Sequence, residues 1–185
     1  MRKNFKPNSA FYPEPVCIIA TYDKKGVANA MNAAWGGISD TNEIGLCISK
    51  THKTTKNILE TKCFTVSCGT KDTCLACDYV GMVSGLKEPN KLEKCGFHAE
   101  KATKVNAPII KELPFALECE LKSYDPKTGH LFGKIVNISI DSKVLNNGKV
   151  SIKKLQPIIF DGMNLTYHVI GEKVGNAFKD YKKIK

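Results

Sequence analysis

Hydrophobic and polar residues alternate along much of the chain, which is the pattern of half-buried β-strands. In residues 116–125 (ALECELKSYD), Leu117, Cys119 and Leu121 fall on one face, and the positions between them are charged. A PKTG turn joins this segment to 130–140, so we expect a hairpin there. The same criteria predict further strands at 15–23, 27–35, 43–50, 63–68, 149–152, 157–160 and 165–171.

Helical patterns are few and short. Residues 54–62 (TTKNILETK) predict a helix with Thr54 or Thr55 as its N-cap. Residues 72–85 and 90–96 predict two more helices, each followed or ended by glycine. Short strands separated by turns favour a small antiparallel barrel. We therefore expect a mainly β protein, with residues 1–185 forming a single domain.

Length and composition narrow the class of protein. The chain has 185 residues, of which 42% are hydrophobic and 25% charged, as in soluble globular proteins. No apolar run approaches the roughly 18 residues of a membrane helix, and the first 15 residues lack the apolar core of a signal peptide. We expect a cytoplasmic protein that does not bind membranes.

The basic charge does not point to a nucleic-acid partner. The formal net charge is +10, but Arg2 is the only arginine and the lysines are scattered along the chain. Nucleic-acid binders usually use the bidentate guanidinium and cluster their charge. A solvated basic surface is the favoured interpretation, and we expect no nucleic-acid partner.

Eight cysteines are many for a cytoplasmic chain, and no secretory signal indicates a disulfide framework. Several lie on apolar alternations and are expected to be reduced core residues: Cys17, Cys47, Cys63, Cys68 and Cys119. The pair in CLAC (74–77) has an alternative role as a redox dithiol. Its spacing from Cys63 and Cys68 matches no common zinc or iron–sulfur pattern, so we expect no metal.

Two neighbouring motifs suggest a flat anionic ligand. In ISKTHKTTKNI (48–58), a strand ends and a helix begins among hydroxyl and lysine side chains, which is typical of a phosphate site. In NAMNAAWGG (29–37), small residues leave the backbone open to a planar group beside Trp35, the only tryptophan. Each motif alone also fits an ordinary helix start and a core tryptophan.

Taken in order, these motifs resemble those of the flavin reductase-like proteins of the FMN-binding split-barrel superfamily, and most closely the flavoredoxin group. The resembling segments cover nearly the whole chain: 12–35, 49–58, 78–96, 106–110, 117–121 and 129–138. The resemblance implies a split β-barrel of about six strands in a Greek-key arrangement, with a few short helices. It also implies non-covalently bound FMN.

The motifs and the resemblance together predict the cofactor-binding residues. These are Asn29, Asn32, Ala33, Ala34, Trp35, Ser49, Lys50, Thr51, His52, Thr54, Asn57, Lys91, His130 and Phe160. Two departures from the family pattern stand out: Asn90 and Leu92 flank Lys91 where the family often has aspartate and phenylalanine, and lysine or histidine replaces the arginine of the phosphate motif.

The function that the resemblance implies is electron transfer through FMN by a flavoredoxin-type carrier. No catalytic side chain is required, because the flavin carries the redox chemistry. Lys91 and His130 are candidates to donate hydrogen bonds to the reduced flavin. A homodimer is implied, with a nicotinamide nucleotide, ferredoxin or another redox protein as donor or acceptor. The alternatives are an NAD(P)H-dependent flavin reductase, a non-catalytic barrel binding heme or pyridoxal phosphate, and a basic interaction protein without a small ligand.

Overall fold

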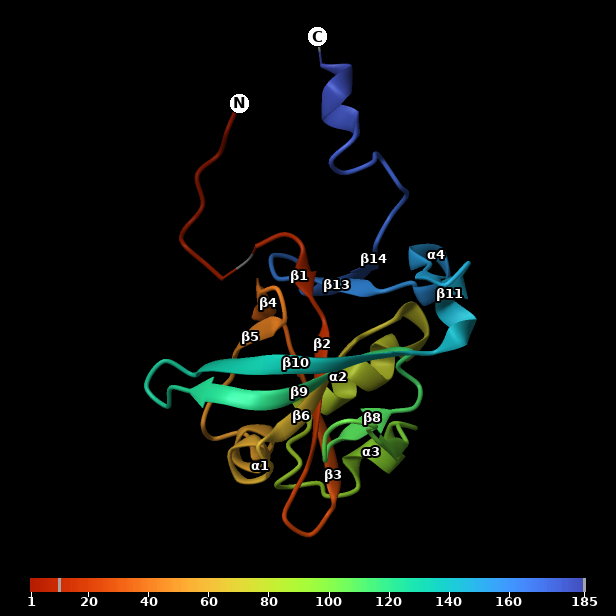
Figure 1. Ribbon diagram of the computed structural model, residues 1–185. Helices are drawn as coiled ribbons and strands as arrows, with labels where there is room; N and C mark the ends of the chain where they lie inside the picture. Colours follow the sequence, from red (N-terminus) through yellow and green to blue (C-terminus); the bar gives the residue numbers. More distant parts are fainter. Residues whose placement is uncertain (10, 185) are drawn as a thin grey trace.

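Antiparallel β-sheet dominates the computed structural model, which describes residues 1–9 and 11–184 (Figure 1). The strands are β1 Glu14–Pro15, β2 Cys17–Tyr22, β3 Ala28–Ala33, β4 Gly36–Asp40, β5 Glu43–Cys47, β6 Cys63–Cys68, β7 Ala99–Lys101, β8 Pro108–Ile110, β9 Phe115–Tyr124, β10 His130–Ile140, β11 Leu145–Asn146, β12 Lys149–Val150, β13 Ile158–Asp161 and β14 Thr166–Val169. The helices are α1 Lys53–Thr61, α2 Cys74–Met82, α3 Lys91–Lys94 and α4 Ile152–Leu155. The predicted fold class, mainly β with short helices, is confirmed.

The main sheet has seven strands in the order β3-β2-β6-β9-β10-β5-β4, all antiparallel. Its two edge strands, β3 and β4, are joined by residues 34 and 35 alone. Three residue steps span at most about 11 Å, whereas the edges of a flat seven-stranded sheet would lie about 29 Å apart. The sheet must therefore curl until its edges meet at Ala34 and Trp35.

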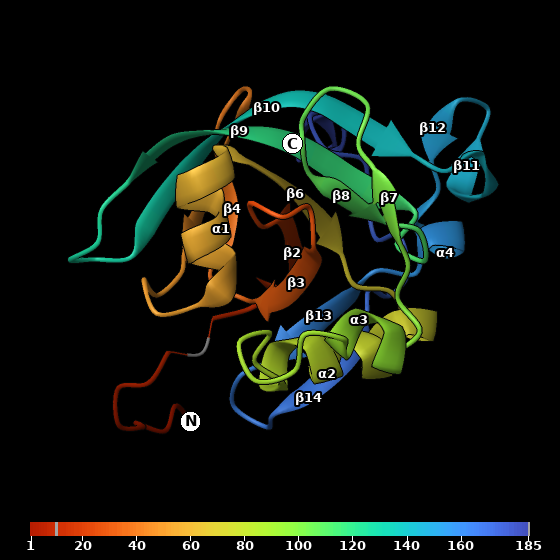
Figure 2. The ribbon, with the colours of Figure 1, turned by 90° about the horizontal axis from the view of Figure 1, so that it is seen from below.

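Two apolar cores occupy the two faces of this curled sheet. The inner core collects Ile19 of β2, Phe64 of β6 and Leu131 of β10, and is closed by Ile58 of α1. The outer core is formed by the alternate strand residues together with side chains of α2, α3 and β13. Figure 2 shows α2 and α3 on the side of β13 and β14, away from α1. Residues that alternate along the strands thus point to opposite faces of the sheet and pack into one core or the other.

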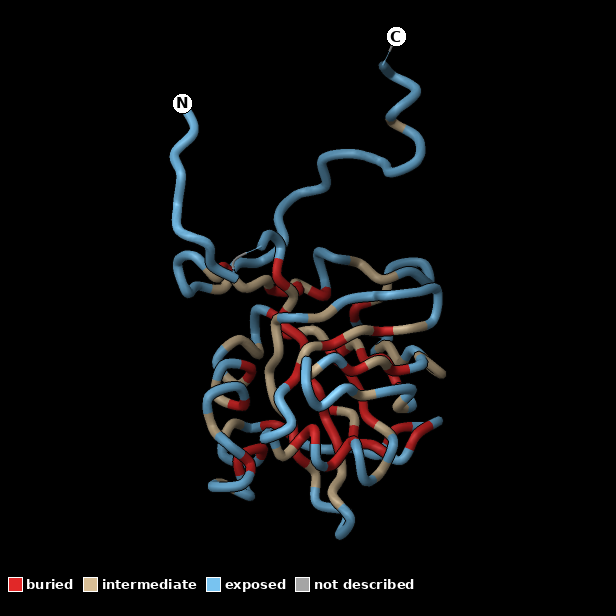
Figure 3. The backbone as a smooth tube through the Cα atoms, turned by 90° about the vertical axis from the view of Figure 1, so that its left-hand side faces the viewer, coloured by how far each residue is buried: buried red, intermediate tan, exposed pale blue. Residues whose placement is uncertain are grey.

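The chain termini project away from this body on the same side (Figures 1 and 3). The segment 171–184, which we call the C-terminal arm, has no strand and ends in a short 3₁₀ turn at Asp180–Lys183. Nearly all of its described residues are exposed, including Val174 and Phe178, whose exposed fractions are both 94%.

Several element boundaries differ from the sequence expectation. The strand β4 was missed because GGISD contains two glycines, and it raises the main sheet from six strands to seven. The helix α1 begins at Lys53 with His52 as N-cap, so the assignment of Thr54 or Thr55 as the cap was wrong. Only Lys149–Val150 of the predicted strand 149–152 is extended, because α4 begins at Ile152.

The cysteines are free, and the prediction that they line the core holds best for Cys17 and Cys119, which are buried. Cys47 of β5 and Cys63 and Cys68 of β6 are only half-buried. Burial raises the pKa of Cys119 to about 12, which keeps this thiol protonated at neutral pH.

Candidate functional site

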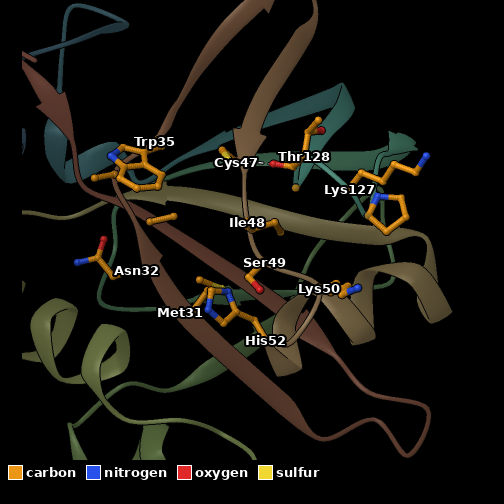
Figure 4. A pocket seen from close by; sticks show the side chains of 14 residues that line it. Met31, Asn32, Trp35, Cys47, Ile48, Ser49, Lys50, His52, Lys127 and Thr128 are labelled. Carbon is orange, nitrogen blue, oxygen red and sulfur yellow. Dashed lines mark hydrogen bonds between the residues drawn. The ribbon is translucent and has the colours of Figure 1, made fainter. Parts of the chain in front are cut away.

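A cavity of about 830 Å³ opens where the two edges of the main sheet meet (Figure 4). Three segments form its walls: the end of β3 with the β3–β4 link, the stretch from β5 to the start of α1, and the β9–β10 turn. The lining residues are Met31, Asn32, Ala33, Ala34, Trp35, Cys47, Ile48, Ser49, Lys50, His52, Pro126, Lys127, Thr128 and Gly129. We call this space the main cavity.

The first wall is built from small residues and one large ring. Ala33 is the last residue of β3, and Ala34 follows it into the link. The carbonyl of Trp35 accepts a hydrogen bond from the Cys47 amide at 2.8 Å, which fixes the link against β5. The indole of Trp35 is 56% exposed and stands at one end of the cavity (Figure 4). An open backbone beside an aromatic ring suits a flat ligand.

The second wall is the tight turn that leads into α1. The carbonyl of Ser49 accepts hydrogen bonds from the His52 amide at 3.2 Å and from the Thr55 hydroxyl at 2.7 Å. The hydroxyl oxygens of Ser49 and Thr51 lie 2.9 Å apart. Among the described residues, no side chain caps α1 and no acidic residue lies in its first turn. This end of the helix therefore keeps its positive partial charge beside Lys50.

The third wall is the β9–β10 turn, residues 125–129, which the sequence analysis identified as a turn but not as part of a site. Gly129 has φ +79°, and its carbonyl accepts from the Ile48 amide at 2.9 Å. A Cβ at this position would lie 3.0 Å from the Ile48 carbonyl oxygen. Asp125 holds the turn by accepting from the Lys127 amide at 2.8 Å and the Thr128 hydroxyl at 2.9 Å. Glycine thus allows Lys127 and Thr128 to reach the rim of the cavity.

A second cavity, of about 310 Å³, adjoins the first through Met31, Asn32 and His52. Asn29 lines it and donates a hydrogen bond to the hydroxyl of Thr54 at 2.8 Å, and both residues are buried. A Cβ on Gly85 would come within 2.1 Å of the side-chain oxygen (Oδ1) of Asn29, so no larger residue fits at position 85 without moving Asn29.

Lys91 lies at the back of the second cavity and is only 3% exposed. Its ammonium group donates to the carbonyls of Val80 at 2.9 Å and Val83 at 2.8 Å. It thereby ties α3 to the end of α2. Burial lowers the pKa of Lys91 to about 8, because a charged amine loses its hydration there.

The predicted cofactor-binding residues separate into three groups in space. Seven line the main cavity: Asn32, Ala33, Ala34, Trp35, Ser49, Lys50 and His52. Asn32 and His52 also line the second cavity, and three residues line that cavity alone: Asn29, Thr54 and Lys91. Four line neither: Thr51, Asn57, His130 and Phe160.

Each residue of the last group has a local reason for its position. Thr51 is exposed and its hydroxyl lies against that of Ser49. Asn57 is buried and donates to the Thr21 hydroxyl at 3.0 Å, which anchors α1 to β2. His130 begins β10 with an exposed side chain. Phe160 packs on Tyr167, with ring centroids 5.7 Å apart, and lines a third cavity of about 220 Å³.

The sequence analysis missed seven lining residues: Met31, Cys47, Ile48, Pro126, Lys127, Thr128 and Gly129. Met31 and Ile48 were quoted within the two motifs, but as strand residues. For the residues of the β9–β10 turn, the one sequence signal was the glycine that ends PKTG, since a glycine in a tight turn often permits a close backbone approach.

The CLAC segment does not have the properties of a reactive dithiol. Cys74 is the first residue of α2, as a redox pair would require, and Cys77 follows one turn later. Burial nevertheless raises the pKa of Cys77 to about 11 and also raises that of Cys74. Within residues 1–9 and 11–184, no group of three or more potential metal ligands is close enough to hold an ion.

Among these same described residues, no helix is both long and apolar enough to cross a membrane.

Comparison with known proteins identifies the family. The sequence profile of the flavin reductase like domain matches residues 9–166. The fold is similar to a flavoredoxin of Desulfovibrio vulgaris (Miyazaki F), with 30% identity, a TM-score of 0.92 and coverage of 97% of this chain and 98% of that one. A flavoredoxin from Methanosarcina acetivorans gives 28% identity and a TM-score of 0.89 over 100% of both chains.

A more distant structure shares the fold alone. It is an FMN-binding domain of flavin reductases-like enzyme from Shewanella baltica OS155, with 20% identity, a TM-score of 0.79 and coverage of 88% and 89% of the two chains. The curled seven-stranded sheet is thus the split barrel expected from the sequence. On the profile match and the full-length similarity to two flavoredoxins, this chain belongs to the flavin reductase-like family.

Proposed function

We propose that the chain binds FMN non-covalently in the main cavity and transfers electrons through it, as a carrier of the flavoredoxin type. One observation carries the proposal: an open, alanine-rich strand end lines the same 830 Å³ cavity as the turn that leads into the uncapped helix α1, up to its N-cap residue His52. The first suits a flat ring system and the second suits a phosphate. The names of the similar structures, two flavoredoxins and an FMN-binding domain, support the same ligand.

The residues present fit this cofactor. Ligand cavities are commonly about 300–1,000 Å³, and the main cavity lies within that range. Lys50 and Lys127 supply positive charge, and the described residues that line the cavity include no aspartate or glutamate. A phosphate monoester would therefore meet cations and hydroxyls beside the positive end of α1, without a repelling carboxylate.

The protein's own residues position the cofactor and tune its surroundings. When bound, FMN supplies reversible electron and hydride transfer. Ser49, Lys50 and the start of α1 would hold its phosphate, and Ala33, Ala34 and Trp35 would flank its ring. No side chain of the cavity needs to act as a general acid or base in this assignment.

Two functions share this site and differ in the electron donor. A carrier receives electrons from ferredoxin or another redox protein, whereas a flavin reductase oxidises a nicotinamide nucleotide directly. The 30% identity to a flavoredoxin over 97% of the chain favours the carrier. The sequence also contains no GxGxxG fingerprint for a separate nucleotide site.

Anaerobic mixing distinguishes the two functions. The FMN-loaded protein is mixed with NADH or NADPH, and flavin absorbance is followed over time. A carrier shows slow or no bleaching, whereas bleaching at about 1–1,000 per second identifies an NAD(P)H-dependent reductase. The absorbance spectrum of the purified protein separates FMN from heme and pyridoxal phosphate, since heme gives a Soret band and pyridoxal phosphate gives no flavin bands.

A homodimer is the assembly that we propose. The C-terminal arm leaves the body with Val174, Phe178, Tyr181 and Ile184 largely exposed (Figure 3). Apolar side chains gathered on an extended arm usually mark a protein–protein contact. A second copy would cover both arms in one two-fold interface.

A further inference from the structure

Two cysteines face each other across adjacent strands beside the main cavity. Cys17 is the first residue of β2, Cys68 is the last residue of β6, and the two are Cα partners in the antiparallel ladder. Residues directly opposite each other point to the same face of the sheet. This face is the inner one, because Cys17 belongs to the inner core.

The hydrogen-bond pattern shows which type of pair this is. The amide of Gly69 donates to the carbonyl of Val16 at 2.9 Å, so the neighbouring pair, Val16 and Gly69, is hydrogen-bonded. Hydrogen-bonded and non-hydrogen-bonded pairs alternate along an antiparallel ladder. Cys17 and Cys68 therefore form a non-hydrogen-bonded pair, whose Cα atoms typically lie about 4.5 Å apart. Disulfides require about 4.4–6.8 Å, so the strands already hold these residues at bonding separation.

The two thiols differ in access. Cys17 is 9% exposed, whereas Cys68 is half-buried at the end of its strand. On its other side, Cys17 pairs with Ala33 of β3, which lines the main cavity. Ala33, Cys17 and Cys68 thus form a row across three adjacent strands. A reagent in solution reaches Cys68 first and Cys17 second.

We propose that Cys17 and Cys68 form a reversible disulfide site whose oxidant is a low-molecular-weight disulfide. The Cys68 thiolate attacks one sulfur of the reagent RSSR, which forms a mixed disulfide and releases one RSH. Cys17 then attacks the Cys68 sulfur and releases the second RSH. In balance, two protein thiols and one RSSR give one protein disulfide and two RSH. The site rests on the fold and not on the proposed FMN binding.

Burial makes the reaction slow at neutral pH. It raises the pKa of Cys17 to about 12 and that of Cys68 to about 11, so little of either thiol is ionised. The reduced form is therefore the resting state, and oxidation requires sustained exposure to the oxidant. Once formed, the bond ties β6 to the strand that supports Ala33.

The test uses the full chain, reduced and then incubated with excess oxidised glutathione at about pH 8.5, where thiolates are more abundant. Free thiols are then alkylated, and peptides are mapped by mass spectrometry without reduction. We expect a cross-linked peptide pair containing Cys17 and Cys68, which dithiothreitol separates. Cys68→Ser should abolish that product. The double variant Cys74→Ser/Cys77→Ser, which removes the CLAC thiols, should still form it.

Three results would overturn the proposal: alkylation of both Cys17 and Cys68 after oxidation, a stable glutathione adduct on Cys68, or a cross-link that joins other cysteines. Each is read from wild-type protein, so the conclusion does not depend on whether a variant folds. Flavin content is measured on the same sample, and its absence would contradict the proposed cofactor without affecting the disulfide result.

Discussion

Lys91 illustrates how a single residue can serve both the fold and the site. It is the only lysine among the described buried residues, and its ammonium group donates hydrogen bonds to the carbonyls of Val80 and Val83. Those bonds close the wall of the second cavity. The sequence analysis named Lys91 as a candidate hydrogen-bond donor to the reduced flavin; that role stays a prediction, and in the structure Lys91 lines the second cavity and not the main one.

The buried lysine predicts a pH dependence of stability. Its pKa is about 8 in the folded protein and 10.5 in the unfolded chain, so the unfolded state binds more protons between these values. The cost of burying the charge is present below about pH 8 and is relieved as the pH rises toward 10.5. The unfolding free energy of the wild type minus that of Lys91→Met should rise over this window by up to about 3 kcal/mol.

Urea unfolding at a series of pH values measures this difference. Taking the difference between two proteins cancels the ionisation of buried thiols, which lowers stability above about pH 9 in both. Lys87→Met, on an exposed loop position, should stay close to the wild type throughout. A difference between wild type and Lys91→Met that is constant from pH 7 to 10.5 would show that the amine is not held as described.

The elements that matter most for the site are the β3–β4 link and the start of α1. The first is short because the sheet closes there, and the second is positively polarised because no described side chain caps it. Lys50 precedes this helix start on the cavity side, whereas Lys56 is exposed on α1 itself and does not line the cavity. The two lysines allow the electrostatic contribution of the helix start to be isolated.

Lys50→Glu should weaken FMN binding by about 10- to 100-fold, because it replaces attraction of the phosphate by repulsion. Lys56→Glu makes the same change of charge and should have a much smaller effect. Titrations at low and high salt provide a further check, since screening should reduce the effect of Lys50→Glu. Equal losses in the two variants would mean that only net charge matters and that the phosphate end is elsewhere.

Sequence patterns predicted strands well where hydrophobic and polar residues alternate clearly. They predicted strands poorly where contacts with distant parts of the chain determine the local structure. The hairpin of β9 and β10 follows directly from its alternating faces and its turn. The strand β4 could not be recognised, because glycine is unfavourable in strands and the reason for Gly36 is a tertiary contact: a Cβ there would lie 2.5 Å from the side chain of Leu46. The same limit applies to the site. The β9–β10 turn joins it only because the sheet curls, which local sequence does not encode.

At the scale of the whole molecule, the curled sheet explains why one end of the barrel holds a cavity while the other is filled. The inner core fills the barrel between β2 and β10, and the cavity remains where the edges converge on the two-residue link Ala34–Trp35. The two termini contribute nothing to that core.

The proposed dimer predicts a measurable mass. Light scattering should give twice the 20.4 kDa of one chain at micromolar concentration. The variant Val174→Ser/Phe178→Ser should shift the protein toward the monomer, because it removes the two most exposed apolar side chains of the arm. Leu75→Ser, which changes a residue on α2 that is 84% exposed, should leave the mass unchanged. A monomeric wild type would contradict the assembly.

The central claim is that the main cavity binds FMN with its phosphate at the start of α1. Trp35, the only tryptophan, lines this cavity and reports on its occupancy through fluorescence quenching. The decisive measurement is a titration of the flavin-free protein with FMN and, separately, with riboflavin, which lacks the phosphate. We expect both to quench Trp35, with FMN binding about 10- to 100-fold more tightly, since hydrogen bonds to a charged group contribute about 1.5–3 kcal/mol. Equal affinity for the two flavins, or no quenching by FMN of the folded protein, would contradict the account.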